Sequence, residues 1–326
     1  MKIVIDIQGL QSPGSRSRGI GRYARSFVKS FIRNSSDFEY ILFANSSLID
    51  SRDDFIEELT DPKLNVNYIN WYAPPTFDLN KNFDDINYQI SVALKTYSLC
   101  NLYPDLVIIT SFFEGYGSNC VIDFDKSFTL PPIVSIFYDL IPLLNSDLYL
   151  KTNPHFRDFY LNRIKSINKL DGLLCISKSA ALEAQNYLDI DNQSIYEISS
   201  ACDKSIFNTS EKLLSSSEID FDYLSEFILY TGAGDPRKNI RNLIEAYSLL
   251  SPSLITKHKL VLAGNFISAE LKNIDLWMQS FGLPSEYIIL LGFVSQEDLV
   301  RLYQNCYLFV LPSFHEGFGL PILEAM

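Results

Sequence analysis

Short apolar runs alternate with amphipathic segments along almost the whole chain, and this alternation constrains the fold most. The segment 2–7 (KIVIDI) is apolar except for Lys2 and Asp6, as in a buried strand, and 21–33 places apolar residues at helical spacing. Further strands are predicted at 40–43, 106–110, 133–137 and 173–176, and a capped helix at 177–188. Buried strands that alternate with helices are typical of a parallel sheet with helical crossovers.

A polar stretch at 203–226, rich in Ser, Asp and Glu, interrupts this alternation. Beyond it, strands are predicted at 227–230, 259–262, 287–291 and 307–311, and helices at 239–250, 269–281 and 296–305. We therefore predict two α/β domains, 1–205 and 206–326, each a doubly wound parallel sheet. Such sheets bind ligands at the carboxyl ends of their strands, so a cleft between the two domains is the expected site.

The charge of the chain excludes some classes of protein. With 27 basic and 39 acidic residues the formal net charge is -12, which disfavours binding to nucleic acid or to an anionic membrane surface. The five cysteines form no CxxC pair, which favours reduced thiols over a disulfide framework or a metal site. The start of the sequence does not resemble a signal peptide, and no apolar run reaches membrane-spanning length. A cytoplasmic protein is expected, with peripheral contact at the inner face of the membrane left open.

The segment 312–326 (PSFHEGFGLPILEAM) carries the strongest functional signal. It follows an apolar strand, and Pro321 suits the first turn of a helix, so the two-glycine loop before it would lie at a helix N-terminus. Such a place favours an anion, phosphate above all. Glu316 and Glu324 would repel phosphate but can accept hydrogen bonds from hydroxyls. A sugar nucleotide offers both groups, whereas the alternative is an ordinary strand–turn–helix with a solvated Glu316.

Two basic residues, Arg237 and Lys238, follow the first strand of the second domain in the segment 230–239 (YTGAGDPRKN). At the start of a helix, cations oppose the helix dipole unless an anion compensates them, so the pair suggests a phosphate site. Two solvated surface residues are the alternative, because exposed cations near a helix end cost only tenths of a kcal/mol.

The segment 19–24 (GIGRYA) formally fits the GxGxxA pattern of dinucleotide-binding proteins. About a dozen residues separate it from the first strand, whereas a dinucleotide-binding turn follows its strand directly, so a nicotinamide cofactor is weakly supported. A mobile surface loop is a further alternative. The segment 137–142 (FYDLIP) ends another strand, and there Asp139 either orients a ligand hydroxyl or caps the next turn; Glu114 follows a third strand.

These segments together resemble glycosyltransferase family 4, whose members are retaining enzymes with the GT-B fold. The resemblance is strong over 227–326, where the Glu-x7-Glu spacing of Glu316 and Glu324 matches the family signature, and moderate before that. It implies two Rossmann-like domains that face a central cleft. It also implies that Glu316 contacts the transferred sugar and that Glu324 contacts the ribose. The backbone of the next four residues would hold the sugar and the diphosphate: Gly317, Phe318, Gly319 and Leu320.

The resemblance assigns roles to residues in both domains. Arg237 and Lys238 would grip the donor diphosphate and act with Glu316 as the catalytic groups, and Gly234 would lie in the donor site. From the N-terminal domain, Gly19 and Gly21 would approach the donor phosphate. The acceptor side would consist of Arg18, Tyr138 and Asp139. Many family members carry a histidine where Tyr138 stands, so a role that depends on histidine is not expected here.

The expected reaction is transfer of a sugar, of mannose or rhamnose type, from a nucleoside-diphosphate sugar to a hydroxyl of a glycan or lipid-linked acceptor, in polysaccharide biosynthesis. Neither a metal nor a cofactor is expected, since Arg237 and Lys238 supply positive charge. An NAD(P)-dependent oxidoreductase and a non-catalytic sugar-nucleotide-binding protein are the alternatives. Family members continue past Met326, so the chain is expected to be truncated, with its last helix unformed or frayed and its activity in doubt.

Overall fold

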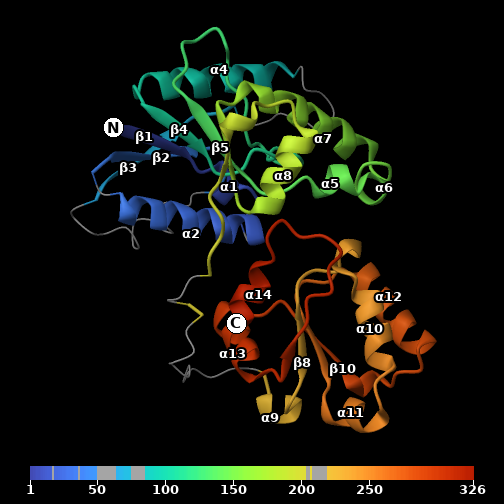
Figure 1. The fold of residues 1–326 in the computed structure, drawn as a ribbon. Helices are drawn as coiled ribbons and strands as arrows, with labels where there is room; N and C mark the ends of the chain where they lie inside the picture. The colour runs from blue at the N-terminus through green and yellow to red at the C-terminus, as the bar shows by residue number, and fades with distance from the viewer. Residues whose placement is uncertain (17, 36, 50–63, 75–84, 203–205, 208–218) are drawn as a thin grey trace. The chain divides into compact units, whose positions relative to one another are not determined.

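The computed structural model describes residues 1–326 except 17, 36, 50–63, 75–84, 203–205 and 208–218 (Figure 1). The chain divides into two compact units, Met1–Ser200 and Ala201–Met326. The boundary predicted from the sequence, between 205 and 206, lies close to this division. Within the described residues, the structure contains no helix that is long and apolar enough to cross a membrane.

Unit 1 is built on a seven-stranded parallel sheet. Its order is β3-β2-β1-β4-β5-β6-β7, so the direction in which strands are added reverses between β1 and β4. The strands are β1 (Lys2–Asp6), β2 (Glu39–Asn45), β3 (Asn65–Trp71), β4 (Leu106–Ile109), β5 (Ile133–Phe137), β6 (Gly172–Cys175) and β7 (Ile195–Glu197). In sheets of this kind, the reversal marks the place where ligands bind, at the carboxyl edge.

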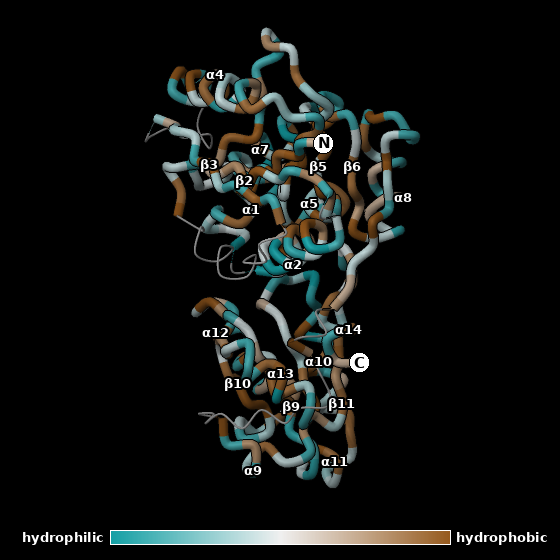
Figure 2. Tube along the Cα trace, turned by 90° about the vertical axis from the view of Figure 1, so that its left-hand side faces the viewer, coloured by the Kyte–Doolittle hydropathy of each residue, from teal (hydrophilic) through white to brown (hydrophobic). Residues whose placement is uncertain are grey.

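Helices cover both faces of this sheet. They are α1 (Gln8–Gln11), α2 (Gly19–Asn34), α4 (Ile86–Cys100), α5 (Ile141–Leu144), α6 (Ser146–Tyr149), α7 (Pro154–Ser166) and α8 (Lys178–Tyr187). Figure 1 shows α2 and α4 on opposite faces. Side chains alternate along β1: Ile3 and Ile5 pack with Val28 of α2, whereas Asp6 contacts Lys95 of α4. The strands are largely hydrophobic in Figure 2, as expected for a sheet that is covered on both sides.

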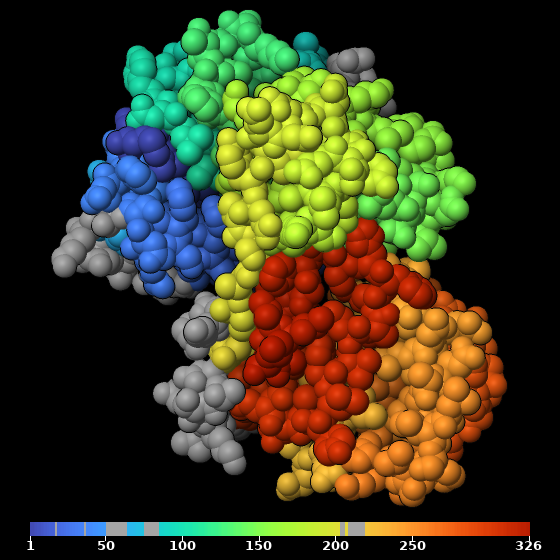
Figure 3. Space-filling view, in the orientation of Figure 1, coloured from blue at the N-terminus to red at the C-terminus, as the bar shows by residue number. Residues whose placement is uncertain are grey.

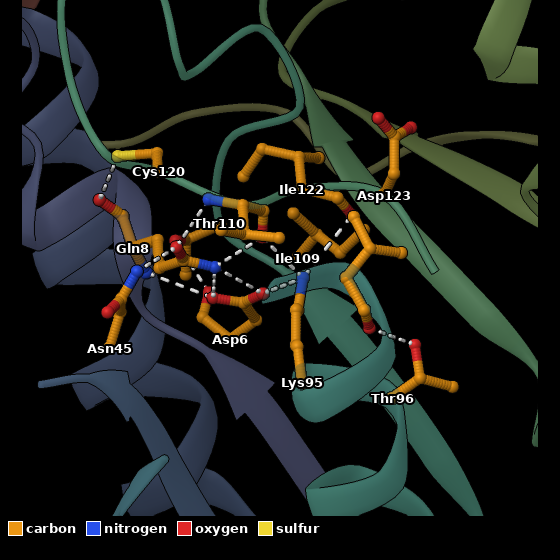
Figure 4. A network of polar contacts seen from close by, with 12 residues as sticks. Asp6, Gln8, Asn45, Lys95, Thr96, Ile109, Thr110, Cys120, Ile122 and Asp123 are labelled. Atoms are coloured by element: carbon orange, nitrogen blue, oxygen red, sulfur yellow. Dashed lines mark hydrogen bonds and ion pairs between the residues drawn. The ribbon is translucent and has the colours of Figure 1, made fainter. Parts of the chain in front are cut away.

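A buried ion pair joins α4 to the end of β1 (Figure 4). The Lys95 ammonium lies 2.7 Å from the Asp6 carboxylate, with side-chain exposures of 0% and 1%. Lys95 also donates hydrogen bonds to the carbonyls of Val121 (2.8 Å) and Ile122 (3.3 Å). Gln8 donates to Asp6 at 3.1 Å and to the Val121 carbonyl at 2.7 Å. Burial lowers the pKa of Lys95, although Asp6 opposes the change. The hydrogen bonds to both charged groups offset part of the cost of burying the pair.

A second buried charged group lies in the same unit. The Arg163 guanidinium, with 1% side-chain exposure, lies 2.9 Å from the Asp123 carboxylate and donates to the Tyr88 hydroxyl at 3.2 Å. Tyr88 in turn donates to Asp123 at 2.6 Å. These contacts tie α4 and α7 to the loop after Val121, because the three side chains come from those three segments.

Unit 2 is built on a four-stranded parallel sheet of order β10-β9-β8-β11. Its strands are β8 (Ile228–Thr231), β9 (Leu260–Ala263), β10 (Ile288–Gly292) and β11 (Leu308–Phe309). Its helices are α9 (Phe221–Leu224), α10 (Ile240–Ser248), α11 (Pro252–Lys257), α12 (Ser268–Ser280), α13 (Gln296–Asn305) and α14 (Leu320–Ala325). Along β9, Leu260 and Leu262 face a core with α10 and α12, whereas Val261 faces a core with α13. In Figure 3 the C-terminal residues (red) form a surface that adjoins the residues of α10 and α12 (orange).

The predicted order of strands and helices is confirmed in outline, with several differences. Two strands of the first sheet, β3 and β7, were not predicted, and neither were the helices α1, α4, α5, α6, α7, α9 and α11. Helix α2 begins at Gly19 rather than at 21. The expectation that the last helix is unformed is wrong, because α14 is helical from Leu320 to Ala325, with Pro321 in its first turn and Ala325 packed against the α13 core.

Candidate functional site

The site in unit 2 forms where the loops that follow β8 and β11 meet. These strands pair in parallel, with Ile228 opposite Leu308, so the two loops leave the carboxyl edge of the sheet side by side. Hydrogen bonds then join the two loops. The Phe314 amide donates to the Arg237 carbonyl (2.9 Å), and the Asn239 side-chain amide donates to the Pro312 carbonyl (3.0 Å).

Both predicted cations contact the first glutamate of the motif. The Lys238 ammonium lies 2.6 Å from Oε1 of Glu316, and the Arg237 guanidinium lies 2.9 Å from Oε2. Arg237 also donates to the His315 carbonyl at 3.0 Å. The three side chains are 12–21% exposed, so they lie at the surface of the edge but are partly shielded from water.

The local sequence explains how the cations reach this position. Asp235 caps a short 3₁₀ helix, η3 (Pro236–Lys238), by accepting from the Arg237 amide, and Asn239 then adopts the left-handed conformation (φ 60°) at the N-cap of α10. The dipole argument from the sequence is therefore wrong in part. Arg237 and Lys238 lie in the last turn of η3, ahead of α10, and the anion that compensates them in the structure is Glu316.

The pKa values follow from burial and from this pairing. Burial raises the pKa of the Glu316 carboxyl, but Lys238 and Arg237 outweigh burial, and the net pKa lies below the ordinary value. Burial lowers the pKa of Lys238 more than Glu316 raises it. Glu316 is thus held ionised, as an acceptor that hydroxyl or cationic groups can use.

The second glutamate of the motif is buried. Glu324, on α14, is 8% exposed, and its Oε2 accepts a hydrogen bond from the Tyr303 hydroxyl at 3.0 Å. The Tyr303 hydroxyl lies 2.9 Å from the Thr231 hydroxyl, at the end of β8. Glu324 was predicted from its motif, whereas the roles of Tyr303 and Thr231 were not, because spacing along one segment cannot show partners that come from other elements.

Glycine is required at two positions of the predicted donor site for different structural reasons. A Cβ on Gly234 would lie 2.2 Å from the Glu270 carboxyl carbon, so this position is packed against α12. Gly319 has φ 88° and forms the N-cap of α14, a conformation that favours glycine. Gly317 and Phe318 precede it in the β11–α14 connection, and Leu320 is the first residue of α14.

Three large apolar side chains at the same edge were missed. Ile267, Phe293 and Phe314 follow β9, β10 and β11, and they are 63%, 78% and 71% exposed. Because the strands are parallel, all three lie at the carboxyl edge. A large apolar residue in the loop that follows a predicted strand, before the next helical pattern, is the signal that could have identified them.

The predicted residues of the first unit gather at the start of α2. Arg18 is the N-cap of α2, and both Gly19 and Gly21 lie within its first turn rather than in a loop. A Cβ on Gly21 would lie 2.4 Å from the Arg16 carbonyl and 2.5 Å from that of Ser15, whereas one on Gly19 would meet nothing within 4 Å. Of the two positions, only 21 therefore requires glycine, because the backbone carbonyls of Ser15 and Arg16 leave no room for a Cβ there.

Tyr138 and Glu114 hold this region to the ends of β4 and β5. The Tyr138 hydroxyl donates to the carbonyls of Thr110 (2.9 Å) and Ile20 (3.4 Å). Glu114 accepts from the hydroxyls of Ser15 (2.5 Å) and Ser111 (2.8 Å).

Asp139 caps the turn that follows β5, because its Oδ1 accepts from the Ile141 amide at 3.0 Å. This contact matches the capping alternative. Among the residues that the structure describes, no group of three or more His, Cys, Asp or Glu side chains could hold a metal ion.

The fold defines the class of protein first. The two α/β units have the GT-B architecture of Rossmann-like parallel sheets, and the solved structures that resemble the chain share it. A sucrose-phosphate synthase from Thermosynechococcus elongatus matches with a TM-score of 0.65 at 15% identity, over 99% of this chain and 78% of that one. Anabaena HepE, in complex with UDP and glucose, matches with a TM-score of 0.62 at 14% identity, over 100% and 78%.

Sequence comparisons then point to particular relatives. Residues 216–326 match the family described as "Glycosyl transferases group 1". The serotype-specific mannosyltransferase WbdA of Escherichia coli is 35% identical over 333 residues, which cover 100% of this chain and 39% of that protein. The O-antigen chain mannosyltransferase B of Escherichia coli is 45% identical over 101 residues, 31% of this chain and 26% of that protein. The chain thus spans about two fifths of WbdA.

Proposed function

We propose that this chain is a glycosyltransferase that moves a mannose-type sugar from a nucleoside-diphosphate sugar to a hydroxyl of a glycan or lipid-linked acceptor in polysaccharide biosynthesis. The observation that carries the proposal is the contact of Glu316 with both Lys238 and Arg237 at the carboxyl edge of the second sheet. The match of 216–326 to the glycosyl transferases supports it, because the cluster lies within that segment. The similarity to WbdA, a mannosyltransferase, supports the mannose-type sugar.

The cations suit the departing group of this reaction. When the bond from the sugar to the diphosphate breaks, negative charge grows on the diphosphate, and preorganised cations stabilise that charge most in a partly desolvated site. Lys238 and Arg237 are 12% and 20% exposed, and neighbouring groups already fix their positions. We assign them to the diphosphate, so that a metal is not required for charge compensation.

The carboxylate suits the sugar. An ionised carboxylate accepts hydrogen bonds from sugar hydroxyls, and the pairing with Lys238 and Arg237 keeps Glu316 ionised. Transfer with retention would follow if the departing phosphate took the proton of the acceptor hydroxyl on the same face of the sugar. In this scheme Glu316 orients the sugar, and the cations exchange part of their contact with Glu316 for the diphosphate.

The exposed apolar side chains at the edge suit the remaining part of such a donor. Phe293, Phe314 and Ile267 offer apolar surface beside the charged cluster. A nucleobase is flat and largely apolar on its faces, so this surface favours a nucleotide over a simple sugar phosphate.

Calorimetric titration of this chain with GDP, UDP and dTDP tests the proposal. Substituting Lys238→Met should weaken binding of the preferred nucleotide by about 1–3 kcal/mol, the range for a hydrogen bond to a charged group. Lys272→Met is the matched control, because Lys272 is an exposed lysine on α12. The Lys272→Met variant should bind the nucleotide with the same affinity as the unsubstituted chain. Equal affinity in Lys238→Met would contradict the proposed site.

Two further measurements separate the alternatives. An assay for transfer of mannose from GDP-mannose to an acceptor glycan distinguishes an enzyme from a protein that only binds sugar nucleotides. Titration with NADH addresses the oxidoreductase, which the structure disfavours: the GxGxxA segment lies within α2 and α1 follows β1 directly, so no glycine-rich turn succeeds that strand.

A further inference from the structure

We propose that Tyr303 is a positioning residue that aims the Glu324 carboxylate at a ribose hydroxyl of the nucleotide. The inference rests on the proposed function, because it assumes that a nucleotide binds at this edge. It adds a specific role for two residues outside the sequence motif, Tyr303 on α13 and Thr231 at the end of β8.

The direction of the hydrogen bonds is fixed by chemistry. An ionised carboxylate only accepts, so the Tyr303 hydroxyl must donate its proton to Glu324, at 3.0 Å. The Tyr303 oxygen can then accept from Thr231, whose hydroxyl lies 2.9 Å away and donates its single proton there. The result is a one-way chain from Thr231 through Tyr303 to Glu324.

The contact to Glu324 comes from a neighbouring element. Glu324 lies on α14, whose N-cap Gly319 supplies no side-chain cap, and Tyr303 lies on α13 (Gln296–Asn305). The Tyr303 hydroxyl is therefore a tertiary polar contact that fixes the direction of the Glu324 carboxylate.

The Tyr303 ring is held independently of its hydroxyl. Its centroid lies 5.4 Å from that of Phe309 and 6.0 Å from that of Phe207, both edge to face. Because these contacts use the ring alone, the substitution Tyr303→Phe keeps the ring packing and removes the hydroxyl that links Thr231 to Glu324. The substitution therefore tests orientation with little change in the core.

The test compares each ribonucleotide with an analogue that lacks the ribose hydroxyls. Calorimetry would give the affinities of GDP and 2′,3′-dideoxy-GDP, and of UDP and its dideoxy analogue. The unsubstituted chain should prefer the ribonucleotide by about tenfold, which corresponds to one hydrogen bond to a charged group. Tyr303→Phe should lower this preference to about threefold or less and leave the affinity for the dideoxy nucleotide unchanged within about twofold.

The ratio separates orientation from general damage. A purely structural role for Tyr303 would weaken both nucleotides together and leave the preference at its original value, which would overturn the proposal. Because both ligands are measured on the same sample, partial unfolding cancels. Thr231→Val should lower the preference by a smaller amount, and Glu324→Gln by at least as much as Tyr303→Phe.

Tyr307→Phe is the matched control. It makes the same chemical change at a tyrosine that is 66% exposed and stacked on His258, outside the hydrogen-bonded chain. Its preference for the ribonucleotide should equal that of the unsubstituted chain, and an equal loss in this variant would overturn the proposal. Failure of the unsubstituted chain to bind either GDP or UDP would instead contradict the proposed function, and this inference with it.

Discussion

Each unit contains a lysine–carboxylate pair, and the two pairs differ in what surrounds them. Lys95 and Asp6 are 0% and 1% exposed, and Lys95 also donates to two backbone carbonyls. Lys238 and Glu316 are 12% and 21% exposed, and they come from two loops at the edge of a sheet. Burial lowers the pKa of both lysines, so a shifted pKa alone does not distinguish a structural pair from a functional one.

The surroundings make the distinction. Lys95 is fully buried, and the Asp6 carboxylate and two backbone carbonyls already satisfy its charge and its donors. Lys238 lies where another anion can reach it, since its partner Glu316 is itself partly exposed. A charge that is paired at a strand end and still accessible is the better candidate for a binding site.

The largest expected effect is the loss of stability when Lys95 is replaced, and its absence would contradict the distinction between the two pairs. Substituting Lys95→Met should lower the free energy of unfolding of unit 1 by about 3–5 kcal/mol, because it leaves the buried Asp6 carboxylate without its cation. Adding Asp6→Asn should recover part of the loss. Urea unfolding would measure both, with Trp71 fluorescence as the signal after Trp277→Phe has removed the other tryptophan.

The corresponding change in unit 2 is the control. Lys238→Met should change the free energy of unfolding of unit 2 by less than about 1 kcal/mol, as for a partly exposed pair. It should be followed through Trp277 after Trp71→Phe. A loss as large as that of Lys95→Met would show that both pairs are structural.

A glycine pair sharpens the comparison within unit 1. Gly21→Ala should destabilise the chain by about 1–3 kcal/mol, because the new methyl group meets the carbonyls of Ser15 and Arg16. Gly19→Ala, two residues earlier in the same helix, should change the stability by less than about 0.5 kcal/mol. Thermal unfolding of the two variants side by side measures the difference, and equal losses would contradict the close approach at Gly21.

The smallest expected effect concerns pH. The pKa of Glu316 is lower in the folded chain than its ordinary value of 4.5, so between these values the unfolded chain binds more protons. The stability that Glu316 contributes is therefore present above pH 4.5 and is lost as the pH falls through the folded pKa. Glu316→Gln should flatten the dependence of stability on pH in that window. Glu286→Gln, at an exposed position, should not.

Elements with a clear hydrophobic pattern were predicted from the sequence, whereas elements whose burial depends on tertiary contacts were not. Strands such as β1 and β5 are short apolar runs and were predicted within one or two residues. β3 alternates polar asparagines with apolar residues at the edge of its sheet, and α4 mixes Ile90 and Leu94 on its exposed side with a buried Lys95. The exposed asparagines of β3 interrupt the apolar run by which the buried strands were identified, and the pattern of α4 is inverted relative to burial at these three positions.

The candidate site was predicted as far as local motifs reach. Glu316, Arg237 and Lys238 were named, and they lie together because β8 and β11 are neighbours in the sheet. The roles of Thr231 and Tyr303 depend on contacts between three elements, which no single segment encodes.

The pairing of β8 with β11 also bears on how such a chain can diversify. The segment between these strands carries β9, β10 and the helices from α10 to α13, yet its length does not set the distance from Lys238 to Glu316, because the strand pairing does. Changes in the turns that follow β9 and β10, which lie at the same carboxyl edge, can accumulate while the strand pairing keeps the charged cluster in place. New specificities can therefore arise around an unaltered chemical centre, and libraries for changing the donor should randomise those turns first.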